Sequence, residues 1–358
     1  MSVAVPLAEV VTYLLFSILI GNTALQFISE KKKPKTYISK KTLLLSTLGI
    51  YIFTFGPVAQ TISYFSDDVG LTLAAYSVLT DFQVGRAWIF IGFMSVFLWM
   101  TLLLNGSKYL QALWLLLMVF AIGYSSHVAS LSFWNGFIAH SIHFLMVTLW
   151  TGILIHVAWF SSDEKKWPLF LRWFTPFAMI NLMILLISGF ALMFYVVEPK
   201  DYVNSWVLPY GQMLLLKHLS IIPLLVFAFL NGVLTRKSLI VSSFDPRPWI
   251  KGESIIIFLV FCFTSVLGTL SPPHEVEFTV QSEGASIWVE WLLGTDIPSV
   301  NNVHLTPNFL SLFLLANSLL FLALIVISFK KVKPYIAILF GMSFVFALYF
   351  GLMISLSI

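Results

Sequence analysis

Ten long apolar stretches, separated by polar loops, limit the fold of this chain more than any single motif does. A helix needs about 20 mostly apolar residues to cross the hydrocarbon core of a bilayer, where only helices and closed barrels satisfy their backbone groups. The stretches predict an all-α fold, a polytopic integral membrane helix bundle of about 9–10 transmembrane helices, in a single transmembrane domain over residues 1–358. The expected spans are residues 5–28, 42–65, 85–104, 109–126, 134–160, 172–197, 210–234, 252–270, 309–329 and 334–356.

Composition excludes a soluble enzyme of ordinary size. Hydrophobic residues make up 59% of the chain and charged residues only 10%, far from the balance of an average soluble domain. The single cysteine, Cys262, excludes an intramolecular disulfide and a Cys-x-x-Cys metal site. Within the apolar stretches Glu9 is the only clear acidic group, and no catalytic arrangement is evident, so we do not expect an enzyme. The first stretch lacks a basic leader and a cleavage site, so we expect it to be retained in the mature protein.

Basic residues fall almost entirely in alternate loops. Under the positive-inside rule these loops are cytoplasmic, which places both termini outside the cell. The net charge of +4 therefore reflects topology and contact with anionic lipid, and predicts no nucleic-acid partner. The outer loop 271–308 is long, and its segment 287–293 has the pattern of a short helix lying at the membrane surface. The loops that share the basic charge contain Lys31, Lys32, Lys33, Lys35, Lys40, Lys41, Lys108, Lys165, Lys166, Arg172, Arg236, Lys237, Arg247, Lys251, Lys330, Lys331 and Lys333.

Residues 123–160 contain four of the seven histidines: His127, His140, His143 and His156. Ionisable groups are costly inside a membrane, so repeated use of histidine on one spanning helix indicates a function. His127 lies on the outer side, where an incoming ion would arrive. His156 is near the cytoplasmic end of the span and is expected at the membrane interface.

His140, His143 and Met146 are spaced three apart, so they share one helix face at depths of about 9, 14 and 18 Å below the outer boundary. In the seventh span, Met213 and His218 lie at depths of about 4 and 12 Å. Imidazole beside thioether favours copper, above all Cu(I). Interhelical hydrogen bonding by these histidines is the simpler alternative. The candidate metal ligands are His127, His140, His143, His218, Met146 and Met213.

Several short motifs between residues 123 and 237 form a family-like core. They are Ser126-His127-Val128, His143 with Trp150 and Gly152, Ile187-Ser188-Gly189, Pro209 to Lys217, and Asn231 before Arg236. With these motifs the chain resembles the bacterial copper resistance protein D family (CopD). Two positions depart from the family pattern, because Gln212 replaces an arginine and Val128 replaces a small residue.

The resemblance implies a multi-pass protein of the bacterial cytoplasmic membrane that transports copper ions, often inward and often with a separate extracytoplasmic copper-binding protein. Nothing resembles a nucleotide-binding loop, so we do not expect ATP to drive transport. Three alternatives stay open. The same ligands can deliver copper to a cytochrome oxidase, histidines on facing helices can hold haem in an electron carrier, and a cofactor-free structural protein can use them to join helices.

Overall fold

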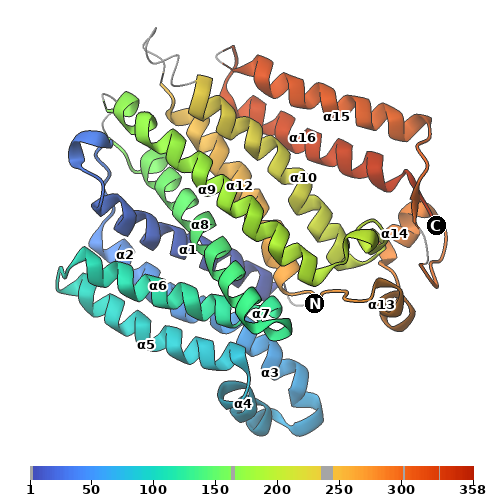
Figure 1. Cartoon of the computed structure of the whole chain (residues 1–358), viewed down its shortest axis with the longest axis horizontal. Coiled ribbons are helices and arrows are strands. Elements are labelled where there is room, and N and C mark those ends of the chain that lie inside the picture. The colour runs from blue at the N-terminus through green and yellow to red at the C-terminus, as the bar shows by residue number, and fades with distance from the viewer. Residues whose placement is uncertain (1–2, 163–165, 235–244, 301–302, 330) are drawn as a thin grey trace. The chain divides into compact units, whose positions relative to one another are not determined.

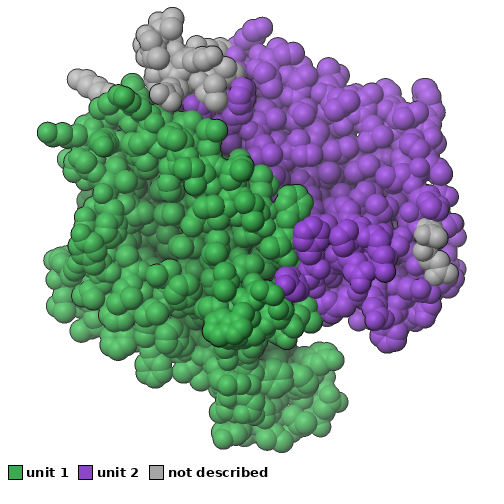
Figure 2. Space-filling model, in the orientation of Figure 1, with its two compact units in different colours: residues 1–192 green, residues 193–358 purple. Residues whose placement is uncertain are grey.

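Figure 1 shows the computed structural model of the chain, which describes residues 3–162, 166–234, 245–300, 303–329 and 331–358. Within these residues, nine helical spans are long and apolar enough to cross a membrane, one of which, Lys40–Val69, consists of two consecutive helices, and a shorter apolar helix covers Lys108–Tyr124. The predicted all-α membrane bundle is therefore confirmed. The helices form two compact units, residues 1–192 and 193–358, which Figure 2 shows in green and purple. The single transmembrane domain stays a prediction.

The first unit is made of helices from α1 to most of α9. Their bounds are α1 Ala4–Gln26, the 3-10 turn η1 Glu30–Lys32, α2 Lys40–Phe53, α3 Phe55–Val69, α4 Leu71–Thr80, α5 Gln83–Leu103, α6 Lys108–Tyr124, α7 His127–Leu131, α8 Phe133–Trp159 and α9 Trp167–Val196. The predicted span 42–65 is divided into α2 and α3 at Thr54. Pro57 explains this break, because proline has no N–H to donate and its ring crowds the carbonyl of Phe53, four residues earlier.

Helices α1 and α8 cross with their backbones in contact. A Cβ atom added to Gly21 would lie 2.4 Å from the carbonyl carbon of Gly152, and one added to Gly152 would lie 2.2 Å from the Ser17 carbonyl oxygen. Small residues permit such close approach between membrane helices. Gly152 of the predicted family-like core therefore has a packing role, and it fixes the position of α8 against α1.

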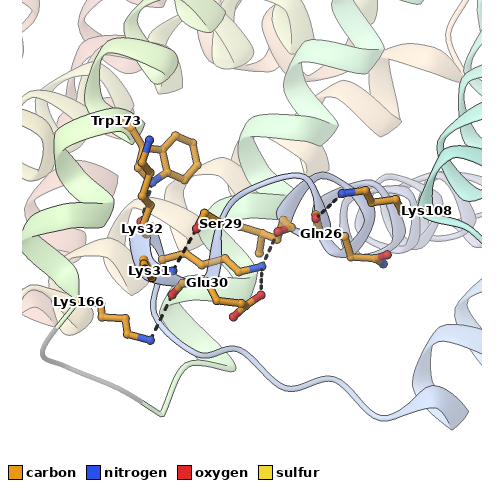
Figure 3. Close-up of polar contacts among 10 residues, drawn as sticks. Gln26, Ser29, Glu30, Lys31, Lys32, Lys108, Lys166 and Trp173 are labelled. Atoms are coloured by element: carbon orange, nitrogen blue, oxygen red, sulfur yellow. Dashed lines mark hydrogen bonds and ion pairs between the residues drawn. The ribbon is translucent and has the colours of Figure 1, made fainter.

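The basic loops of the first unit meet at one end of it (Figure 3). Lys108, at the start of α6, donates to the Gln26 carbonyl at the C-terminus of α1 (3.1 Å), and Lys166 donates to the Glu30 carbonyl (3.2 Å). Cations near a helix C-terminus are favoured by its unpaired carbonyls and by the helix dipole. The alternation of basic loops thus corresponds to a real clustering in space, while the orientation of this end toward the cytoplasm stays a prediction.

The second unit contains the rest of the chain. Its elements are the 3-10 turns η2 Pro199–Asp201 and η3 Asn204–Val207, α10 Pro209–Phe229, the π-helical segment η4 Leu230–Leu234, α12 Arg247–Gly268, α13 Val276–Glu283, α14 Ile287–Leu293, β1 His304–Leu305, α15 Phe309–Ser328, α16 Pro334–Met353 and β2 Leu356–Ser357. The two short strands pair antiparallel, with His304 opposite Ser357.

The predicted outer loop 271–308 is largely structured. Helix α14 confirms the short helix expected at 287–293. Val280 of α13 and Val289 of α14 are buried in one apolar cluster with Val345 and Met353 of α16. This segment therefore covers one end of α10 and α16, since the same cluster includes residues of α10.

Helix α12 begins at Arg247, five residues before the predicted start of this span. Pro248 suits the first turn of a helix, where an N–H has no intrahelical partner, and Trp249 and Ile250 are fully buried. The earlier start places Glu253 inside the helix rather than at its end. The expectation that Glu9 is the only acidic group within an apolar helix is therefore wrong, because Glu253 is 3% exposed.

Candidate metal centre

The strongest candidate site lies along one face of α8. His140, His143 and Met146 occupy successive turns of this 27-residue helix, and all three are partly buried. Residues of α9 in the same unit contact the two deeper members of this line. The structure therefore places all three residues on one spanning helix, whereas their alignment as ligands and their binding of a metal stay predictions.

His143 is held by the Ile187-Ser188-Gly189 motif. Its Nδ1 lies 3.1 Å from Ser188 Oγ, which itself donates to the Ile184 carbonyl at 2.8 Å. In the tautomer whose proton is on Nδ1, Ser188 Oγ accepts from Nδ1–H, and the lone pair of that tautomer is on Nε2. A Cβ atom at Gly189 would lie 3.3 Å from His143 Cε1, so glycine allows the ring to lie against α9. This arrangement is the one by which proteins orient imidazole ligands.

Met146 is contacted by a residue that the sequence analysis missed. Asn181 Nδ2 donates to the Met146 carbonyl at 3.1 Å and lies 3.5 Å from its sulfur. Asn181 is 1% exposed, and its Oδ1 is buried without a hydrogen-bond partner in the described part of the chain. A lone asparagine in an apolar helix was the available signal, since polar residues in spans are usually interhelical contacts or parts of a pathway.

His218 belongs to the second unit, where Tyr202 holds it. The Tyr202 hydroxyl lies 2.8 Å from His218 Nδ1, and burial raises the pKa of Tyr202 to about 12, so the phenol keeps its proton at neutral pH. This contact orients the ring by its Nδ1 edge and leaves any metal contact to Nε2. Met213 precedes His218 by five residues, about 140° around the helix, so the two do not share a face.

His127 and His274, which were predicted to lie in outer loops, are outside the long apolar helices. His127 is exposed at the first residue of α7, whose N-terminus is capped by Ser126 Oγ accepting from Ala129 N–H at 3.2 Å. His274 lines an acidic hollow of about 610 Å³ together with Glu198 and Asp201.

His156 is buried within the protein, which its expected place near the membrane interface did not predict. It is 1% exposed, and its Nδ1 lies 2.7 Å from the Gly152 carbonyl, one turn earlier in α8. The close crossing of α1 and α8 at Gly152 places this turn within the protein. The basic loops nearby gave no indication of this burial, which depends on the rotation of α8 against α1.

Among the described residues, no group of three or more His, Cys, Asp or Glu side chains is arranged to hold a metal ion. His143 and His218 lie in different units. The joint use of His127, His140, His143, His218, Met146 and Met213 therefore stays a prediction.

The spans and the polar contacts within them define a multi-pass membrane protein. Residues 168–267, from the start of α9 to the end of α12, match the family model CopD, "Copper resistance protein D". This match supports the copper resistance protein D family and confirms the resemblance drawn from the motifs. The match includes Ser188, His218, Asn231 and Glu253, whereas His143 precedes it. No curated protein and no solved structure matches the chain.

Proposed function

We propose that the protein transports copper ions across the bacterial cytoplasmic membrane, in the inward direction, with copper as cargo. The observation that carries this proposal is the contact of His143 Nδ1 with Ser188 Oγ, which holds an imidazole of a spanning helix against α9. His140 lies one turn before His143 on the spanning helix, and Met146 lies about one turn after it. Imidazole and thioether together favour copper over harder cations.

In this proposal copper moves along a short series of ligands. His127 receives the ion at the extracytoplasmic surface from a separate copper-binding protein, and the α8 line accepts it within the bilayer. His218 and Met213 supply further ligands from α10. Exchange requires sites that bind strongly enough for entry and weakly enough for release. A site with a small number of neutral ligands meets this requirement better than a closed site of several anionic ligands does.

The test is copper uptake by liposomes that contain the purified protein, together with copper bound per protein. We expect His143→Ala to abolish most uptake and Met146→Leu to reduce it. Met183→Leu is the matched control, because Met183 lies on α9 with 61% of its surface exposed. Uptake by His143→Ala at the wild-type rate would contradict the proposal. Tight copper binding without uptake would favour delivery to an oxidase, and a Soret band with iron would favour a haem protein.

A further inference from the structure

A second buried polar contact lies between α10 and α12. Glu253 is 3% exposed and Asn231 is 4% exposed. Glu253 follows Arg247, the first residue of α12, by six residues, or about 9 Å along the helix. Asn231 lies in the π-helical segment η4, and such segments are rare and often occur at functional sites. The copper pathway proposed above uses neither residue.

The amide of Asn231 joins the two helices through its nitrogen. Nδ2 donates to Glu253 Oε2 at 2.7 Å and to the Trp249 carbonyl at 3.2 Å, so both amide hydrogens are used. Oδ1 of Asn231 is buried without a hydrogen-bond partner in the described residues. Asn231 therefore has no further hydrogen to donate, while its Oδ1 still lacks a donor.

The surroundings of Glu253 are apolar. At the neighbouring Gly252, an added Cβ would lie 2.9 Å from the Phe227 ring of α10 and 3.6 Å from Ile338 of α16. In the described part of the chain, no cation forms an ion pair with Glu253. An isolated carboxylate in such surroundings is strongly disfavoured, whereas a neutral acid is tolerated.

The titratable groups on the elements packed against Glu253 are few. Helix α12 itself carries Arg247, Lys251 and Cys262. On α10, Tyr210 lies in the first turn, and His218 and Lys217 precede Asn231 by 13 and 14 residues, about 20 Å along the helix. On α16, Tyr335 lies near the first turn and Tyr349 lies near the opposite end.

We propose that Glu253 and Asn231 form a proton-binding site in which Glu253 is a neutral acid that donates its hydrogen to Asn231 Oδ1. The carboxyl and amide groups are then complementary, since each supplies one donor and one acceptor to the other. Release gives the carboxylate and one proton, which passes to water at the end of α12, and uptake reverses this step. Exchange of this proton accompanies copper movement; this coupling rests on the proposed function, while the proton site itself does not.

The proton site is tested by infrared spectroscopy of the purified protein during a pH titration. All variants are made in a Glu9→Gln background, because Glu9 is the other acid within an apolar helix. At neutral pH we expect the carbonyl-stretch band of a protonated carboxylic acid, which is absent once Glu253→Gln is added. The matched control is Glu283→Gln, since Glu283 is exposed at the end of α13, and it should retain the band. A wild-type protein without this band, or a band that persists in Glu253→Gln, would overturn the proposal.

Glu253→Gln should also fold with nearly wild-type stability. The glutamine amide accepts from Asn231 Nδ2 and donates to Oδ1, as the neutral acid does. Loss of stability in Glu253→Gln, with Glu283→Gln unaffected, would show instead that the carboxylate form is required.

The coupling is tested in liposomes that contain a pH-sensitive dye. We expect copper uptake by the wild-type protein to change the internal pH, and Glu253→Gln to move copper down its gradient without this change. Copper uptake by the wild-type protein with no pH change would overturn the coupling. Failure of the wild-type protein to move copper would refute the transport proposal, and the infrared result would still decide the proton site.

Discussion

Two buried asparagines, Asn181 and Asn231, make the same kind of contact with different partners. Each donates through Nδ2 to a backbone carbonyl of another helix, and each has a buried Oδ1 without a partner in the described chain. The second contact of Asn181 is the Met146 sulfur, whereas that of Asn231 is the Glu253 carboxyl. Under the two proposals above, asparagine supports two different ions, because a thioether suits a soft metal and a buried acid suits a proton.

The two asparagine contacts should also differ in how much they stabilise the protein. Comparing the stability of the two variants is the most direct test of the distinction between the contacts. Asn231→Leu leaves the buried Glu253 carboxyl without its donor, a loss of about 1–3 kcal/mol. Asn181→Leu removes the donor to the Met146 carbonyl and also an acceptor that is already unsatisfied, and it leaves no buried carboxyl without its donor, so we expect a smaller loss. Thermal unfolding of the two variants in the same detergent measures the difference. Equal destabilisation would show that the two asparagines act only as helix contacts of the same strength.

Much of the fold could be predicted because the length of an apolar stretch determines whether it spans. The stretch expected at 85–104 is α5, Gln83–Leu103. The start of α9 was placed too late, since Arg172 was taken as part of a cytoplasmic loop. The helix begins at Trp167, and this side chain and Phe170 are fully buried, so they pack within the protein and not in a polar loop.

The site was predicted in part, because some contacts lie within one helix face. The spacing of His140, His143 and Met146 shows in the sequence that they share a face of α8. The pairing of Asn231 with Glu253 cannot be seen in the sequence, since it joins two helical segments at a separation of 22 residues. Helices that are apolar all round give no periodic signal of which face meets which neighbour. Their rotation is decided by close contacts, such as that of Gly21 with Gly152.

Ser188 provides a test of the candidate metal site, because it contacts the candidate ligand His143. Ser188→Ala removes the acceptor for His143 Nδ1–H, so the ring loses the contact that fixes its orientation and tautomer. We expect copper affinity to fall about 10-fold, with stability little changed, because partners that orient a ligand typically contribute 10–100-fold. Copper titration of the purified variant measures this fall. An unchanged affinity would assign the His143–Ser188 contact to helix packing alone.

The smallest expected effect concerns Tyr202, which holds His218. Burial raises the pKa of Tyr202 from 10.0 to about 12, so the folded protein retains the phenol proton where the unfolded chain releases it. The resulting stability is fully present below about pH 10 and is lost as pH rises toward 12. Tyr202→Phe lacks this titration, and its stability should therefore decline less over that range. Unfolding measured at a series of alkaline pH values tests this. Parallel declines in the two proteins would mean that Tyr202 ionises as readily in the folded chain as in the unfolded one, and His218 would then be held by a partner that solvent reaches.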